Sequence, residues 1–120
     1  MKVKKIYLHT FHGQLRNNIQ RRYKKRVDHI IWLPQIEEKL LRKHRVLVEE
    51  VEEVFFSSPQ IFFVERGYTS GENLYAACGK TEASRSLIIF FILKSDNRAL
   101  VISARDMDRK EKKRYGKKAS

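Results

Sequence analysis

Three side chains in this sequence could move protons or hold an anion: Glu72, His44 and Arg105. A carboxylate can act as a base, and an imidazole can act as acid or base because its pKa lies near neutrality. The planar guanidinium of Arg105 can donate two parallel hydrogen bonds to a phosphate. Arg105 ends a predicted strand, where the chain turns into the last helix. These residue types suit acid–base chemistry at a phosphate group.

Each of these three residues also has a structural interpretation. Arg105 could be a surface arginine that pairs with Asp106 or Glu111. Glu72 could be an ordinary exposed carboxylate at a strand end. His44 lies on the inner face of a predicted helix, which is equally compatible with a hydrogen-bonded structural histidine. The sequence leaves both interpretations open.

The charge of the chain indicates a polyanionic partner. The 120 residues carry a formal net charge of +12, and the hydrophobic content of 42% is enough for one domain with its own core. Residues 1–26 contain nine bases and no acid, and residues 105–120 contain eight bases and three acids. A nearly neutral body therefore has two cationic ends, which would attract nucleic acid or an acidic protein.

Five further residues could contact a nucleic acid. Lys80 and Arg85 flank a predicted turn and could touch the backbone, although charges in turns also serve solubility. Trp32 could stack on a base or belong to the core. Tyr115 and Glu111 are four residues apart on one face of the last helix, so both could reach RNA or pack that helix on the sheet.

Several other kinds of site are excluded by the residue pattern. No Cys/His cluster has zinc-ligand spacing, no glycine-rich phosphate loop is present, and no serine or cysteine nucleophile has a matching base. We therefore expect no metal and no cofactor. The longest apolar run, Leu87–Leu93, is far shorter than the roughly 20 residues of a membrane span. No signal-peptide pattern is visible, so we expect a cytoplasmic protein in which Cys78 is a packed core thiol.

Hydrophobic periodicity predicts a strand and two helices in the first half of the domain. His29–Leu33 reads as a strand, and Pro34 suits the first position of the helix that follows. Acidic residues near the start of this helix and basic residues near its end suit the helix dipole. Val48–Phe56 forms the second helix, with an apolar stripe on one face and glutamates on the other.

The second half changes to the alternation that is typical of strands. Four strands are predicted, at Gln60–Glu65, Asn73–Cys78, Ser86–Leu93 and Ala99–Ala104. The short turns between them favour an antiparallel meander, with the apolar Leu87–Leu93 as a central strand covered on both faces. A final helix, Arg109–Tyr115, is predicted to be capped by Asp108 with Glu111 as its reciprocal partner.

Several short motifs occur in an order and spacing that resemble the BrnT family of ribonuclease toxins, within the RelE-like superfamily. They are L-R-K-H at 41–44, V-E-E-V at 48–51, S-G-E at 70–72, G-K-T at 79–81 with Arg85, and I-S-A-R-D-M at 102–107 with Glu111 and Tyr115. The last block is the most specific. The resemblance covers about residues 30–115, so we assign 27–120 to a toxin domain and 1–26 to a basic, in part disordered, extension.

The resemblance implies both a fold and a function. The fold would be α+β and RelE-like: two N-terminal helices on a mainly antiparallel sheet of four to five strands, with a short C-terminal helix. The function would be metal-independent RNA cleavage, with the substrate's 2′-OH as nucleophile and a 2′,3′-cyclic phosphate as product. A BrnA-like antitoxin with a ribbon-helix-helix DNA-binding region would neutralise the toxin, and operator DNA would be reached only through that antitoxin.

Two positions depart from the family pattern. The family commonly has an arginine two positions after the glutamate of S-G-E, where this chain has Leu74. Arg45 replaces a glycine that would end the first helix in a left-handed conformation. Leu74 favours an alternative function, a non-catalytic RNA- or DNA-binding module that keeps the fold. A third alternative is a chain whose basic ends mainly grip a partner protein.

Overall fold

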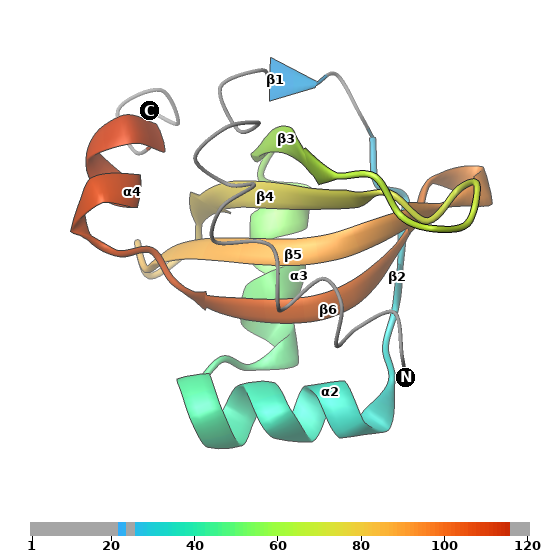
Figure 1. Cartoon of the computed structure of the whole chain (residues 1–120). Helices are drawn as coiled ribbons and strands as arrows, with labels where there is room; N and C mark the ends of the chain where they lie inside the picture. The colour runs from blue at the N-terminus through green and yellow to red at the C-terminus, as the bar shows by residue number, and fades with distance from the viewer. Residues whose placement is uncertain (1–21, 24–25, 116–120) are drawn as a thin grey trace.

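The computed structural model describes residues 22–23 and 26–115 (Figure 1). The sequence-predicted extension therefore lies mostly outside the described residues. The elements follow the predicted order, with β1 and the short helical turn η2 added and with the first helix ending in the turn η1. They are β1 (Arg22–Tyr23), β2 (His29–Ile31), α2 (Pro34–Lys39), η1 (Leu40–His44), α3 (Val48–Phe56), β3 (Gln60–Glu65), β4 (Leu74–Lys80), β5 (Ser86–Lys94), η2 (Ser95–Asn97), β6 (Arg98–Asp106) and α4 (Arg109–Tyr115).

The strands form one sheet in the order β1-β3-β4-β5-β6-β2. Neighbouring strands are antiparallel, except that β2 runs parallel to β6. The predicted α+β class, with two helices, a mainly antiparallel sheet and a short last helix, is confirmed. The two-residue β1 was not predicted: Arg22 and Tyr23 belong to a charge run, yet they pair with β3 and form the edge of the sheet.

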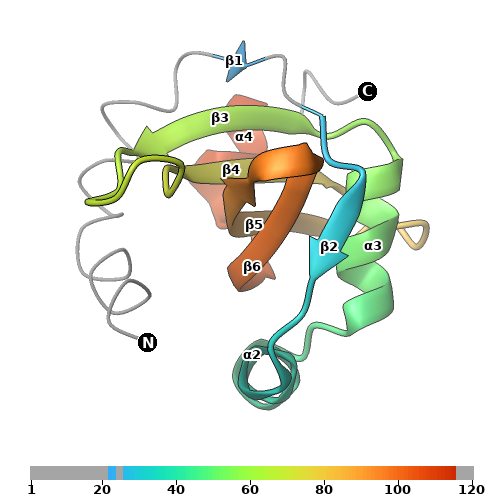
Figure 2. The same cartoon turned by 90° about the vertical axis from the view of Figure 1, so that its right-hand side faces the viewer.

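Helices cover the two faces of the sheet differently. Figures 1 and 2 show α2 and α3 together on one face of the curved sheet and α4 on the opposite side. On the first face, Ile36, Val51 and Phe91 belong to one buried cluster, and on the other face Phe90 and Tyr115 belong to a second. The predicted central strand is confirmed, because residues 87–92 of β5 are all buried. Cys78 is buried as well, as expected.

The first helix is continuous from α2 into the wider turn η1 and stops at Arg45. Pro34 occupies its first turn, as predicted. Arg45 adopts φ 54° and ψ 38°, the left-handed conformation that the family's glycine would supply. A side chain in this conformation costs about 1–2 kcal/mol, so other contacts must hold the end of this helix. Within the described residues, no helix is long and apolar enough to span a bilayer.

Candidate active site

Arg105 lies at the end of β6, held by a buried carboxylate. Its Nη1 and Nη2 donate to Oε1 and Oε2 of Glu111 at 2.8 and 2.9 Å, which is a bidentate pair. Nη1 also donates to the carbonyl of Asp106 at 3.1 Å, and the guanidinium lies 5.8 Å from the ring centroid of Phe90. The Arg105 side chain is 22% exposed and that of Glu111 only 7%. The orientation of Arg105 is therefore fixed on one side and open on the other.

The remaining donors of Arg105 could meet a phosphate. A guanidinium has five N–H groups, and three of those of Arg105 are used by Glu111 and the Asp106 carbonyl. The N–H of Nε and one N–H of Nη2 donate to none of the residues that the structure describes. Burial acts to lower the Arg105 pKa, but the hydrogen bond and charge of Glu111 outweigh it and raise this pKa.

Glu111 is anchored by the first turn of α4. Its backbone N–H donates to Oδ1 of Asp108 at 2.8 Å, and its Oε1 accepts from the backbone N–H of Asp108 at 2.9 Å. The predicted capping box is therefore confirmed. The same carboxylate caps the helix and holds Arg105, so α4 positions the guanidinium. Glu111 thus serves the fold here, since its side chain is almost wholly buried.

His44 lies at the end of η1, which contacts β6. Its pKa is lowered from the usual value, first by partial burial and then by the positive charges of Lys39, Arg105 and Lys43. The carboxylate of Asp106 opposes this effect. A neutral imidazole is therefore favoured at neutral pH, and a neutral imidazole can accept a proton.

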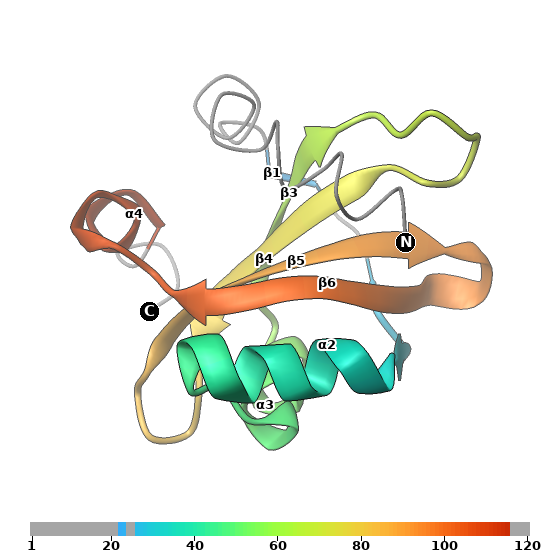
Figure 3. The ribbon, with the colours of Figure 1, turned by 60° about the horizontal axis from the view of Figure 1, so that its bottom comes forward.

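Cations surround this end of β6. Figure 3 shows the end of the first helix and α4 on either side of the β6 arrowhead. Glu111 and Tyr115 face inward from α4, so its other five residues face solvent, and all five are basic: Arg109, Lys110, Lys112, Lys113 and Arg114. From the sequence these charges were only part of the cationic C-terminal end and belonged to no predicted site. The four-residue spacing of Glu111 and Tyr115 already indicated that both lie on one face of the helix, which leaves the basic residues on the other face.

Arg85 connects four segments of the chain beside this site. Nε and Nη2 donate to the two oxygens of Asp106 at 2.7 and 3.1 Å. Nη1 donates to the carbonyl of Arg45 at 2.7 Å and to Oε1 of Glu50 at 2.9 Å. Nη2 also donates to the carbonyl of His44 at 2.9 Å. These bonds raise the pKa of Arg85, with the Asp106 hydrogen bond the largest favourable cause.

All five N–H groups of Arg85 are thus used. In this conformation the side chain has no donor left for an RNA phosphate, which was its expected role. It instead satisfies two carbonyls at the end of the first helix, where the intrahelical partners are missing. This contact also explains how Arg45 is held in a left-handed conformation without a glycine.

Glu72 lies at the other end of the sheet and forms an ion pair with Lys94. Arg105 pairs in register with Ile88, six positions before Lys94 on β5. Since a strand rises about 3.3 Å per residue, the two places are about 20 Å apart. Glu72 and Arg105 therefore cannot contact one phosphate in this structure. His44 and Arg105 lie on contacting elements, and the charge of Arg105 acts on His44, whereas Glu72 lies outside this group.

Tyr115, another predicted site residue, lies in the core. Its ring centroid is 4.9 Å from that of Phe62, and its carbonyl accepts a hydrogen bond from Gln60 at 2.8 Å. Burial raises the pKa of Tyr115 to about 12, so the phenol stays protonated at neutral pH. The packing alternative for Tyr115 is therefore what this structure shows.

The last two predicted site residues are Trp32 and Lys80. Trp32 is partly buried against the core on the α2–α3 face, and its indole N–H has no hydrogen-bond partner among the described residues. Lys80 is exposed at the end of β4, beside a small cavity lined by Pro59 and Gly79. Neither residue is linked by any described contact to Arg105.

Comparison with known proteins identifies the family. Residues 32–111 match the family model described as the ribonuclease toxin BrnT of type II toxin–antitoxin systems. No curated protein matches the chain. The matched region is two thirds of the sequence and contains His44, Arg85, Arg105 and Glu111. The chain therefore belongs to the BrnT family of ribonuclease toxins.

Proposed function

We propose that this protein is an endoribonuclease whose active site lies at the end of β6, with Arg105 and His44 as its reactive groups. The observation that carries the proposal is the Arg105–Glu111 pair, which fixes a guanidinium beside a histidine of lowered pKa. The basic surface of α4 adds phosphate contacts that need no particular sequence. Family membership supports RNA as the substrate.

The reaction follows from these groups. Neutral His44 takes the proton of the 2′-OH, and the 2′-oxygen attacks the adjacent phosphorus. Arg105 donates its free N–H groups to the phosphorane, where negative charge accumulates. The bond to the 5′-oxygen breaks, and this oxygen takes a proton from water. The products are a 2′,3′-cyclic phosphate and a 5′-OH end, so no further reactant is needed.

The pH profile of cleavage tests the role of His44. Because His44 must be neutral to act as base, the single-turnover rate should rise with pH below the usual histidine range and then level off. Lys43→Gln removes a positive neighbour, so it should raise the His44 pKa and move the rising limb to higher pH. Arg66→Gln, which removes one charge in the loop after β3, is the matched control. A wild-type profile in His44→Gln would exclude His44 as the base.

The salt dependence of binding tests the role of α4. Replacing Lys110 and Lys113 with Gln should weaken RNA binding and flatten its plot of log K against log salt. Each lost contact to single-stranded RNA changes the slope by about 0.7. The control replaces Arg66 and Arg98 with Gln, at places away from α4. An equal change of slope in both variants would mean that α4 has no special role.

A second function stays open, that of a non-catalytic nucleic-acid-binding module. Leu74 stands where the family has arginine, and in this structure it is fully buried in the core. An arginine is therefore missing from the Glu72 end of the sheet, whereas Arg105 and Glu111 are both present at the other end. RNA binding without any cleavage by the wild-type protein would favour this module.

Membership of the family implies a cognate antitoxin. We propose that this antitoxin is BrnA-like, with a ribbon-helix-helix region that binds operator DNA for the complex. Acidic side chains of the antitoxin would suit the cationic surface around Arg105.

A further inference from the structure

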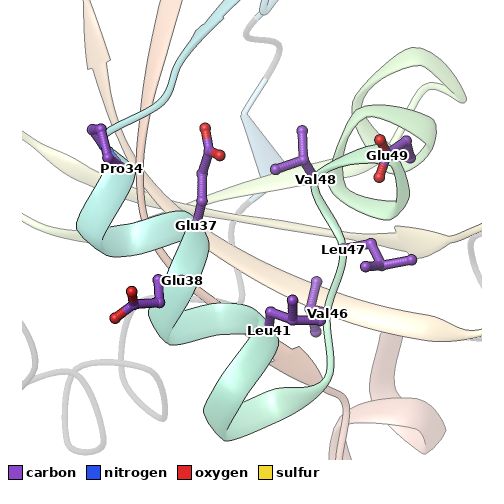
Figure 4. A pocket seen from close by; sticks show the side chains of 8 residues that line it. All are labelled: Pro34, Glu37, Glu38, Leu41, Val46, Leu47, Val48 and Glu49. Atoms are coloured by element: carbon purple, nitrogen blue, oxygen red, sulfur yellow. The ribbon is translucent and has the colours of Figure 1, made fainter.

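A groove lies between the first helix and the start of α3, with an apolar floor (Figure 4). It has a volume of about 360 Å³, and its apolar lining consists of Pro34, Leu41, Val46, Leu47 and Val48. Leu41 and Leu47 are 49% and 47% exposed, although Val46 between them is buried. Two half-exposed leucines beside one hollow are an apolar surface that a partner could cover.

The rim of the groove is acidic. Glu37, Glu38 and Glu49 line it together with the apolar residues. Glu38 pairs with Arg42 at 3.3 Å, but Glu37 and Glu49 form no ion pair within the part of the chain that the structure describes. This local negative charge is notable in a chain of net charge +12.

The apolar lining and the acidic rim together determine what kind of molecule can bind in the groove. Carboxylates on the rim repel phosphates, so the groove is unsuited to RNA. An apolar floor with charged edges suits a polypeptide segment that buries apolar side chains and places lysines or arginines at the rim. Neither His44 nor Arg105 lines the groove, so its occupant can bind without touching the reactive groups.

We propose that this groove docks an amphipathic, basic segment of the cognate antitoxin, with apolar side chains between Leu41 and Leu47. The inference rests on the proposed function only in taking the antitoxin as the partner. It implies that the antitoxin carries two kinds of charge: acidic groups for the surface around Arg105 and basic groups for Glu37 and Glu49. Neutralisation and docking then use separate parts of the toxin.

The test uses the full chain co-expressed with the product of the neighbouring reading frame. The groove variant is Leu41→Asp with Leu47→Asp, and the control is Phe56→Asp, which changes a 70% exposed side chain on α3 outside the groove. We expect the groove variant to bind the partner at least about 10-fold more weakly, as for a central apolar contact. The control should bind like wild type. RNA cleavage by both free variants should be unchanged on the pH plateau, where His44 is neutral.

Charge reversal gives an independent readout. Glu37→Lys with Glu49→Lys should also weaken the complex, and should do so most at low salt, where the carboxylates attract a basic segment most strongly. The same variant should stay folded, because both carboxylates are exposed. A variant that binds more tightly than wild type would show that the occupant is acidic and would overturn the proposal.

The other outcomes are distinguishable. Wild-type affinity in the groove variant overturns the inference, as does a wild-type chain that binds no product of the neighbouring frame. A homodimer that the groove variant abolishes, seen by sedimentation, would assign the groove to a second copy instead. Groove-dependent binding by a toxin that cannot cleave RNA would refute the proposed function and leave the inference standing.

Discussion

Replacing Arg105 with alanine is expected to slow single-turnover RNA cleavage by about 10²–10³-fold, the usual effect of losing one preorganised donor to a developing charge. RNA binding should fall much less, because the basic residues of α4 keep their phosphate contacts. The measurement is cleavage of a labelled RNA under saturating protein, with binding followed on the same RNA by anisotropy.

Stability must be separated from chemistry in this experiment. Without Arg105, the buried carboxylate of Glu111 keeps only the hydrogen bond from the Asp108 N–H. Leaving a buried charge without its partner lowers the free energy of unfolding by about 3–5 kcal/mol. Arg105→Lys keeps the positive charge and loses the planar fork, so it should stay more stable while remaining slow. Rates are therefore compared well below the melting temperature of each variant.

Two further variants locate the chemistry. Arg98→Ala removes an exposed arginine at the opposite end of the same strand and should leave the rate unchanged. Glu72→Gln tests the candidate base that lies about 20 Å from Arg105. If Glu72→Gln abolished cleavage while Arg105→Ala did not, the active site would lie at the other end of the sheet.

Local sequence rules were sufficient for the elements of this fold. Pro34 at the start of the first helix, the Asp108–Glu111 cap and the apolar run in β5 are each governed by neighbours within a few residues. Such features follow from backbone hydrogen bonding and periodicity, which a single sequence displays. The strand β1 escaped prediction because Arg22 and Tyr23 belong to a charge run without the apolar alternation that predicts a strand.

The site could be predicted only in part. Arg105, His44 and Glu111 were identified as candidates. The sequence could not show whether Glu111 contacts RNA or pairs with Arg105, because this depends on how deeply its side chain is buried. Glu72 was grouped with Arg105 because a carboxylate base and a phosphate-binding guanidinium suit the same reaction, whereas the strand register puts them at opposite ends of the sheet. Register and burial are properties of the whole sheet, so residue type and spacing cannot supply them.

Replacing Arg85 with alanine is expected to destabilise the fold by about 2–4 kcal/mol, since one change removes the hydrogen bonds to two carbonyls at a helix end, to the partly buried Glu50 and to the exposed Asp106. For a domain of this size the melting temperature should fall by roughly 10 °C. Cleavage should slow as well, because the end of the first helix carries His44 and loses its attachment to β6.

The matched variants separate this positioning role from RNA contact. Lys80→Ala, at the other side of the same turn, removes an exposed charge and should leave the melting temperature unchanged. Arg85→Lys keeps the charge but replaces a five-donor fork with three donors, so most of the stability should still be lost. If Arg85 instead held RNA, Arg85→Ala would melt like wild type, bind RNA more weakly and show a flatter salt dependence. A fall in melting temperature with an unchanged salt slope is what the five hydrogen bonds require.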